Sequence, residues 1–319
     1  MGKTWVLKEF GRRCYENTAY FNFDENEEYR QFFETTKDVD RILQNLMLAS
    51  GQKIVPEKTL IIFDEVQDCP KVINSMKYFC ENAPQYHIAC AGSLLGIALA
   101  KPSSFPVGKV NFMQMDPMTF TEFLLANGDE NLAEYLETAD IIEPLPDAFF
   151  NPLYEKLKMY YVTGGMPEPV KMWTEARDVD ALQWLVDARL AQLAPTAFGE
   201  GNRLFTEFKG ALTENFVLQT LITQFEVTPR YWTQTNPPYE VDFLIQREND
   251  IFPVEVKSEA NTASRSLKKF KELFPDQVKL RVRFSLDNLK LDGDVLNIPL
   301  FMADQTDRLI GIALRQKKL

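Results

Sequence analysis

Two adjacent carboxylates, Asp64 and Glu65, stand directly after an apolar run at residues 60–63. One interpretation is a buried strand that ends where the chain reaches a polar surface loop. The other is a Walker B strand, whose first acid holds Mg²⁺ and whose second polarises the water that attacks a nucleotide γ-phosphate. The second interpretation requires a phosphate-binding loop elsewhere in the chain.

Gly2, Lys3 and Thr4, followed by a helical pattern, match the last part of the loop G-x-x-x-x-G-K-[ST]. In such a loop, backbone N–H groups and a helix N-terminus cradle the phosphates. We expect Lys3 to reach the β- and γ-phosphates and Thr4 to bind Mg²⁺ together with Asp64. The two motifs predict ATP and Mg²⁺ as cofactors and Glu65 as a catalytic residue. Because the strand before the loop is missing, we expect the sequence to begin inside the loop.

A second group of polar residues combines Asp242 with Glu255 and Lys257. Period-two geometry places Glu255 and Lys257 on one face of their strand. If Asp242 lies on the neighbouring strand, the two acids can share a divalent metal while Lys257 positions or activates water, as in PD-(D/E)xK nucleases. Glu214, on a preceding helix, is a candidate third metal ligand. The alternative is a surface hairpin whose alternating charges protect a sheet edge.

Helices and strands alternate in the part of the chain that carries the first two motifs. The pattern predicts a helix after Thr4, and further helices at residues 39–49 and from Pro70 onward. Strands are predicted at residues 19–23, 60–63 and 86–91. Such alternation is typical of an α/β fold with a parallel, doubly wound sheet, here a P-loop NTPase sheet.

The remaining chain divides into a helical region and a small α/β unit. A capping box at Thr119 and Glu122 predicts a helix start, and helices follow around residues 132–136 and 153–161 with a break at residues 164–169. Later elements are a helix at 212–224, strands at 231–232, 241–245 and 252–256, a helix at 264–274 and a strand at 279–284. We therefore expect an NTPase core at 1–118, a helical lid at 119–198, and a PD-(D/E)xK-like domain at 199–319.

Composition narrows the classes of function. The 319 residues carry a formal net charge of −11, which argues against a broad basic surface that coats nucleic acid. A local cluster at Lys268, Lys269 and Lys271 is compatible with phosphate contacts or with a solvated helix face. The single histidine, His87, nearly excludes a histidine zinc site or a Ser-His-Asp triad. The four cysteines lack C-x-x-C spacing and no stretch is long enough to span a bilayer, so we expect a cytoplasmic protein with no membrane partner.

Several stretches in a fixed order carry a resemblance to a known family: MGKTWVLKEF, LIIFDEVQDCP, AGSLLGIAL, FPVGKVNFMQMDPMTFTEFL, YYVTGGMPEPV, GALTENFVLQTL, EVDFLI and IFPVEVKS. The chain resembles prokaryotic AAA-type ATP-binding proteins that carry a C-terminal domain of unknown function related to restriction-endonuclease folds. The resemblance implies a Walker A end at Lys3 and Thr4 and a Walker B pair at Asp64 and Glu65. It also implies that Gln67 belongs to a DE-x-Q motif.

Further positions follow from the same resemblance. Ser93 falls where a polar sensor follows the fourth strand, and Lys109 falls where many relatives have arginine, although lysine lacks the guanidinium fork. Relatives have a longer middle with a winged-helix-like segment between the stretches matching residues 176–180 and 199–205. We expect residues to be missing there, so that the numbering is continuous but the chain is not.

The leading expectation is a Mg²⁺-dependent ATPase of the AAA/STAND-like class with a nuclease-like C-terminal domain. The alternative is a nucleotide-dependent switch, whose C-terminal domain binds a protein partner or nucleic acid without cutting. A third possibility is a metal-dependent nuclease that the ATPase regulates. Sustained phosphate release distinguishes the first from the second. The sequence names neither the partner nor the oligomeric state.

Overall fold

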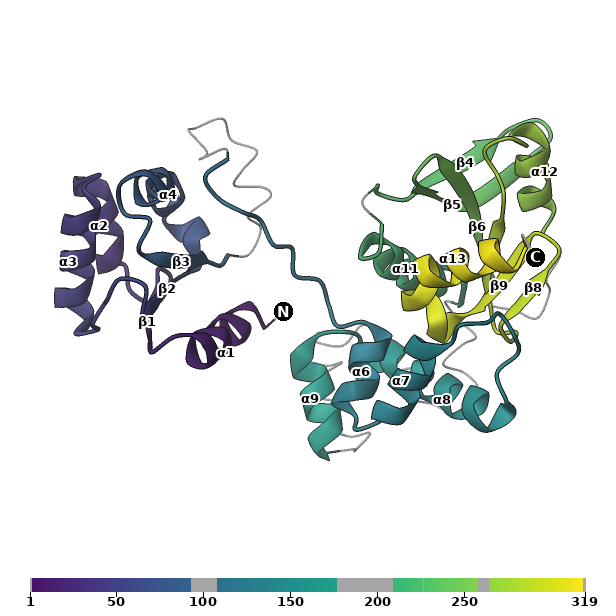
Figure 1. Ribbon diagram of the computed structural model, residues 1–319, viewed down its shortest axis with the longest axis horizontal. Coiled ribbons are helices and arrows are strands. Elements are labelled where there is room, and N and C mark those ends of the chain that lie inside the picture. Colours follow the sequence, from purple (N-terminus) through teal and green to yellow (C-terminus); the bar gives the residue numbers. More distant parts are fainter. Residues whose placement is uncertain (1, 93–107, 177–208, 226, 258–263, 318–319) are drawn as a thin grey trace. The chain divides into compact units, whose positions relative to one another are not determined.

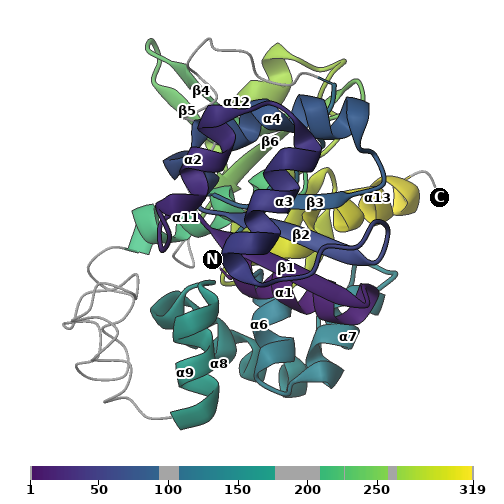
Figure 2. The same cartoon turned by 90° about the vertical axis from the view of Figure 1, so that its left-hand side faces the viewer.

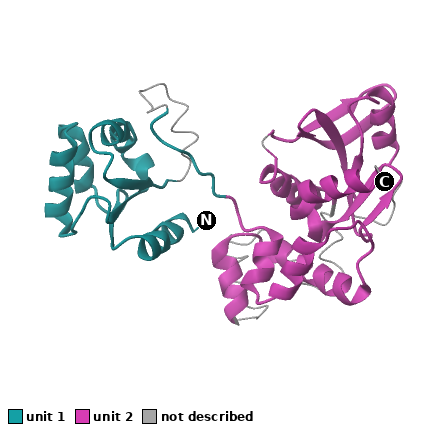
Figure 3. Ribbon diagram, viewed as in Figure 1, with its two compact units in different colours: residues 1–115 teal, residues 116–319 magenta. Residues whose placement is uncertain are grey.

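The computed structural model describes residues 2–92, 108–176, 209–225, 227–257 and 264–317 (Figure 1). The chain forms two compact units, Met1–Met115 and Asp116–Leu319 (Figure 3). Each unit has its own sheet and its own hydrophobic core. Among the described helices, none combines the length and the apolarity needed to cross a bilayer.

The sheet of the first unit is parallel, with the strand order β1-β2-β3. Its strands are β1 (Asn17–Asn22), β2 (Thr59–Asp64) and β3 (His87–Cys90). The register pairs Asn22 with Asp64 and Phe63 with Cys90, so the carboxyl ends of neighbouring strands lie together. The predicted parallel sheet is therefore confirmed.

Helices cover both faces of this sheet. They are α1 (Lys3–Cys14), α2 (Glu28–Thr35), α3 (Val39–Ser50) and α4 (Pro70–Asn82), with a short 3-10 turn η1 (Val66–Asp68). Figure 2 shows α2 and α3 in front of the sheet, where alternate side chains of β1 and β2 form one core with them. Helix α1 lies on the opposite side (Figure 1). The sequence predicted these helices except α2.

A glycine lets α1 approach the sheet closely. A Cβ on Gly11 would lie 2.3 Å from the Thr18 hydroxyl oxygen, which is shorter than any ordinary contact. Glycine at this position therefore sets the distance between α1 and β1. The same packing brings the first turns of α1 to the carboxyl edge of β2, where Asp64 lies.

The second unit begins with a group of helices: α6 (Phe120–Ala126), α7 (Glu130–Thr138), α8 (Asp147–Thr163) and α9 (Pro167–Ala176). The capping box is confirmed, because Thr119 and Glu122 exchange side-chain and backbone hydrogen bonds. The prediction that Pro167 and Pro169 continue the break after α8 is wrong. Pro167 is the first residue of α9, and prolines are tolerated in a first turn because those N–H groups have no intrahelical acceptor.

Met118 anchors the chain where it enters the second unit. Its N–H donates to the Gly165 carbonyl at 2.7 Å, and its carbonyl accepts the Tyr160 hydroxyl at 2.5 Å. A Cβ on Gly165 would lie 2.3 Å from the Met118 carbonyl oxygen, so this backbone approach requires glycine. Nearby, the N–H and the hydroxyl of Thr121 both donate to Asp304.

The sheet of the second unit has six strands in the order β4-β5-β6-β7-β9-β8. They are β4 (Arg230–Gln234), β5 (Tyr239–Arg247), β6 (Asp250–Val256), β7 (Arg281–Ser285), β8 (Lys290–Asp292) and β9 (Val295–Pro299). β5 and β6 form the predicted antiparallel hairpin, whereas β6, β7 and β9 run parallel. The sheet is thus mixed, and the α/β class predicted for this part of the chain is confirmed.

The other elements of this unit are α11 (Lys209–Ile222), α12 (Arg265–Leu273), the 3-10 turn η4 (Leu300–Gln305) and α13 (Thr306–Gln316). One hydrophobic core includes residues of α6, α7 and α8 together with α11, α13 and the strands β6, β7 and β9. A smaller core lies beneath α12, where Leu267 and Phe270 pack with Val241. The helices expected to form a lid therefore share a core with the C-terminal sheet. The division at residues 118 and 198 stays a prediction, as does the discontinuity within 177–198, which lies outside the described residues.

Candidate functional site

Asp64 lies at the carboxyl end of β2, beside the end of β1, and is 2% exposed. Its Oδ2 accepts hydrogen bonds from the Thr4 hydroxyl at 2.7 Å and from the Tyr20 hydroxyl at 2.9 Å. Its Oδ1 accepts the backbone N–H of Glu65 at 3.0 Å. The residues Thr4 and Asp64, which the sequence assigned to two separate motifs, are therefore in direct contact.

The first turn of α1 is open toward an anion. Gly2 is the N-cap residue, with a left-handed φ of 73°, and its carbonyl accepts the Val6 N–H at 3.0 Å. Throughout α1, which is fully described, no side chain caps the start and no acid lies in the first turn. The N–H groups there carry partial positive charge. Lys3, half-buried as the first helical residue, adds a full positive charge to an end that suits a phosphate.

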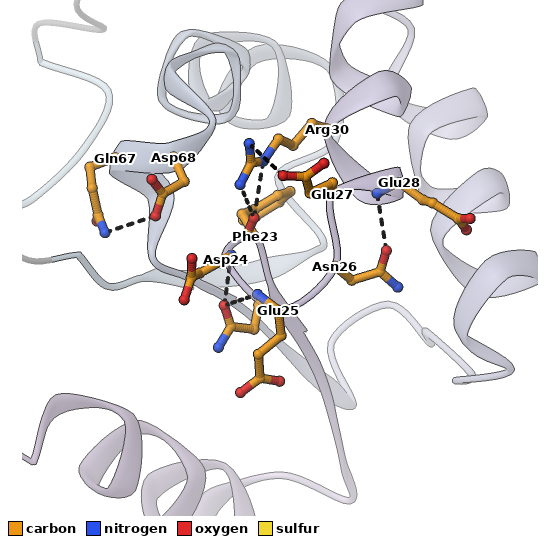
Figure 4. Close-up of polar contacts among 10 residues, drawn as sticks. Phe23, Asp24, Glu25, Asn26, Glu27, Glu28, Arg30, Gln67 and Asp68 are labelled. Atoms are coloured by element: carbon orange, nitrogen blue, oxygen red, sulfur yellow. Dashed lines mark hydrogen bonds and ion pairs between the residues drawn. The ribbon is translucent and has the colours of Figure 1, made fainter.

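Glu65 adopts an uncommon backbone conformation directly after the strand. Its φ of 53° and ψ of 46° are left-handed, which costs free energy for a residue with a Cβ. The Gln67 amide donates to Glu65 Oε2 at 2.6 Å and to Asp68 at 3.1 Å, the latter drawn in Figure 4. Gln67 therefore orients the carboxylate that the sequence predicts to activate water.

The turn after β1 borders the same edge of the sheet. Asn22 Oδ1 accepts the backbone N–H groups of Asp24 and Glu25, and Arg30 donates twice to the Phe23 carbonyl, at 3.0 and 2.7 Å (Figure 4). These hydrogen bonds hold the backbone of the turn, which carries several acidic residues. Its geometry is therefore maintained without the Asp64 carboxylate.

Tyr20 is a site residue that sequence reasoning missed. It lies on β1 and points to the side of α1, where Lys8 Nζ lies 3.5 Å from the centre of its ring. Burial and the hydrogen bond to Asp64 raise the pKa of Tyr20 to about 12, so the phenol stays a donor at neutral pH. The only signal in the sequence is alternation, since Ala19 and Phe21 face the core and Tyr20 must face the other side.

Two predicted sensor residues have different outcomes. Ser93 lies outside the described residues. Lys109 Nζ lies 3.5 Å from Glu81 Oε1, so it forms an exposed ion pair with the last part of α4. Its phosphate-sensing role stays a prediction.

The chemistry of the Asp64 site fits a magnesium ion. Asp64 and Thr4 supply a carboxylate and a hydroxyl, and oxygen donors are the ligands that Mg²⁺ prefers. Their contact shows that both side chains reach one point beside the start of α1. The residues predicted to bind the cofactor are therefore compatible with it, although their roles stay predictions.

The second predicted group lies on β5 and β6. The ladder pairs Phe243 with Val254, and Asp242 and Glu255 are the next residues along β5 and β6. Glu255 Oε1 lies 2.9 Å from Lys257 Nζ. Glu255 and Lys257 are close enough to Asp242 to act on its pKa, and the predicted convergence of the two acids on one face of the sheet stays a prediction.

Asp242 and Glu255 have few hydrogen-bond partners. Asp242 Oδ2 accepts the Val256 N–H at 2.7 Å. Burial raises the pKa of Asp242 to about 6, and Glu214 and Glu255 also raise it, whereas the Val256 N–H and Lys257 act in the opposite direction. Glu255 is 5% exposed, and within the described residues its Oε2 has no hydrogen-bond partner.

Metal binding at this second group stays a prediction. In the described ranges, no group of three or more His, Cys, Asp or Glu side chains is arranged to hold a metal ion. Glu214 is close enough to Asp242 to raise its pKa, but the three acids do not form such a group. The candidate cation ligands here are Asp242 and Glu255, and the buried Oε2 of Glu255 has no hydrogen-bond partner within the described residues.

A guanidinium and an amide extend this row of polar residues. The register places Arg283 of β7 beside Glu255 and Asn297 of β9 beside Arg283. Arg283 Nε donates to Asn297 Oδ1 at 2.9 Å, and the Ser285 hydroxyl donates to the same atom at 2.8 Å. Sequence reasoning did not connect these residues to Asp242, because their proximity depends on the strand order.

Comparisons with known proteins bear on each unit separately. Residues 1–124 match the family model of an AAA domain, and residues 209–301 match a domain of unknown function (DUF4143). Among solved structures, the chain aligns with protein VC1899 from Vibrio cholerae at 13% identity, over 98% of this chain and 94% of that one, with a TM-score of 0.25. A search of curated proteins gave no match.

The two family matches confirm part of the resemblance. The AAA-domain match includes Lys3, Thr4, Asp64 and Glu65, so the N-terminal unit is similar to AAA-type ATP-binding proteins as expected. The C-terminal match is to a domain without a known function, as expected. Its relation to restriction-endonuclease folds stays a prediction.

Proposed function

We propose that this chain, whose N-terminal part matches an AAA domain, binds ATP with Mg²⁺ at the carboxyl edge of β1 and β2 and hydrolyses it. The observation that carries the proposal is the 2.7 Å hydrogen bond between the Thr4 hydroxyl and Asp64 Oδ2. This hydrogen bond joins the start of α1 to the carboxyl end of β2. A buried acid and a hydroxyl that meet beside an uncapped helix start provide both a cation ligand set and an anion site.

Each residue has a specific role in this proposal. The backbone of Gly2 and the N–H groups of the first turn bind phosphate oxygens, and Lys3 neutralises their charge. Thr4 and Asp64 hold the metal ion, which when bound offsets the negative charge of the β- and γ-phosphates. Glu65, oriented by Gln67, polarises the attacking water. Ser93 and Lys109 are proposed to sense the γ-phosphate.

Steady-state phosphate release tests this function. Glu65→Gln should slow release by about a hundredfold or more while nucleotide binding persists, because general base catalysis commonly contributes this much. Glu57→Gln is a matched control, since Glu57 is an exposed glutamate with a similar left-handed φ of 63°. Equal rates for the wild type and Glu65→Gln would contradict the catalytic role. A wild type that retains its nucleotide without turnover would favour the nucleotide-dependent switch.

The proximity of Asp242 to Glu255 and Lys257 supports a second candidate function for the C-terminal domain. The acid pair is proposed to bind Mg²⁺ or Mn²⁺, with Glu214 completing the ligand set after a rearrangement, and Lys257 to position the attacking water of a nuclease. The unsatisfied Glu255 oxygen favours this proposal over a purely structural pair.

Incubation with DNA and RNA substrates and either metal tests the second candidate. Lys257→Ala should abolish cleavage, whereas Lys290→Ala, an exposed lysine on β8, should leave cleavage unchanged. If the wild type cuts none of the substrates, the domain is a recognition module for a partner or nucleic acid and not an enzyme.

A further inference from the structure

Tyr20 contacts the acid at the centre of the proposed nucleotide site. Its register partner on β2 is Ile62, but its long side chain reaches along the strand to Asp64, where the hydroxyl donates to Oδ2 at 2.9 Å. The amide of Asn22 donates to the same hydroxyl oxygen at 3.3 Å. Because the oxygen accepts from Asn22, its hydrogen is directed to Asp64. The direction of the hydrogen bond is therefore set by the end of β1.

The ring of Tyr20 also contacts α1. Lys8 Nζ lies 3.5 Å from the ring centre, within the range of a cation–π interaction. Thr4 and Lys8 are one turn apart on α1, so they project from the same side of the helix. Tyr20 thus touches both the helix that carries Thr4 and the strand that carries Asp64.

The two hydroxyl donors of Asp64 are not equivalent once a metal ion is present. If Thr4 bound the ion, its oxygen would serve both the ion and Asp64, whereas Tyr20 on β1 would serve the carboxylate alone. A hydrogen bond between a hydroxyl and an ionised carboxylate is stronger than one between neutral groups. The Tyr20 hydroxyl therefore orients the Asp64 carboxylate in a way that does not require Thr4.

We propose that Tyr20 is a positioning residue for the metal-binding carboxylate, so that its hydroxyl sets the Mg²⁺ dependence of nucleotide binding. This inference rests on the proposed ATP function of the same site. A purely structural role, in which Tyr20 only satisfies a buried acid, would change folding stability without changing how binding depends on Mg²⁺.

Titration of a fluorescent ATP analogue at varied Mg²⁺ concentration tests the inference. Tyr20→Phe removes the hydroxyl and keeps the ring that packs under Lys8. The Mg²⁺ concentration for half-maximal binding should rise about tenfold, because a hydrogen bond to a charged group is lost. Binding measured in excess chelator should be unchanged within about twofold. Tyr29→Phe is the matched control, since Tyr29 packs edge-on against Phe21 on the other face of β1.

A double-mutant cycle shows whether Tyr20 acts through Asp64. In the Asp64→Asn background, the effect of Tyr20→Phe on Mg²⁺ dependence should largely disappear. An unchanged Mg²⁺ dependence in Tyr20→Phe, or an equal effect in both backgrounds, would overturn the inference while leaving the proposed function intact. A wild type without Mg²⁺-dependent nucleotide binding would overturn both.

Discussion

Each unit has an aspartate on a strand of its sheet, buried Asp64 in the first and half-buried Asp242 in the second, and the two aspartates have different hydrogen-bond partners. Asp64 of β2 accepts three hydrogen bonds, from two hydroxyls and one backbone N–H. Asp242 of β5 accepts the Val256 N–H and lies among the carboxylates of Glu214 and Glu255. The first acid is surrounded by hydrogen-bond donors, whereas the second has one backbone donor, two neighbouring carboxylates and the ammonium group of Lys257.

The Asp64 site is therefore preorganised by hydrogen bonds, whereas the Asp242 carboxylate lies in unfavourable electrostatic surroundings. Donors around Asp64 fix the orientation of its carboxylate before any ligand arrives. Asp242 has a pKa raised to about 6 by burial, with its acidic neighbours adding to the shift. Such a group gains free energy from a proton or a cation. We therefore expect substitution of the two aspartates to change stability in opposite directions.

The largest expected effect is the loss of stability in Asp64→Ala. Removal of the carboxylate, which belongs to a residue only 2% exposed, leaves the Glu65 N–H and the hydroxyls of Thr4 and Tyr20 without their acceptor. The free energy of opening at β2 should fall by about 3 kcal/mol, because buried donors lose their partner. Hydrogen exchange of β2 amides, measured without nucleotide, reports the first unit separately from the second.

Asp24→Ala is the control for this substitution, since Asp24 is an exposed acid in the turn after β1. Surface substitutions of this kind change stability by at most about 0.5 kcal/mol. An Asp64→Ala protein as stable as the Asp24→Ala control would contradict the account of Asp64 as a preorganised acid.

A smaller effect of opposite sign is expected for Asp242→Asn. The pKa of Asp242 lies above its ordinary value of 3.8, so between these two values the folded state binds more protons than the unfolded state. Stability from this group is therefore lost as pH rises from about 4 through about 6. The asparagine side chain of the variant cannot ionise, and its amide oxygen can still accept the Val256 N–H. Asp242→Asn should thus be more stable than the wild type at neutral pH, and the difference should shrink toward pH 4.

Hydrogen exchange of β6 amides across this pH range measures the effect. Asp292→Asn serves as the control, because Asp292 is an exposed acid on β8. A stability difference between wild type and Asp242→Asn that does not vary with pH would show that the Asp242 carboxyl does not carry the unfavourable charge.

The local patterns of the sequence predicted most elements of both units. The apolar run before Asp64 and the Thr119 capping box each mark an element that the structure contains. Elements near the C-terminus were not predicted. α13 contains Gly311, which is a weak helix former, and the Arg247 guanidinium of β5 packs beside it. Such a tertiary contact has no local signal.

Site residues that belong to local sequence motifs were predictable, whereas residues that reach the site only through the packing of elements were not. Thr4 and Asp64 belong to motifs whose geometry is known in advance. Tyr20 becomes a site residue only because α1 and β2 flank its strand, and Arg283 only because β7 lies beside β6.

The most direct test of the central claim is nucleotide titration of Lys3→Ala. The account predicts that ATP affinity in the presence of Mg²⁺ falls about tenfold or more, because a charge-assisted phosphate contact at the start of α1 is lost. Lys71→Ala, which removes an exposed lysine at the start of α4, should bind as the wild type does. Equal affinities of wild type and Lys3→Ala for ATP would contradict the assignment of a phosphate-binding site to this end of α1.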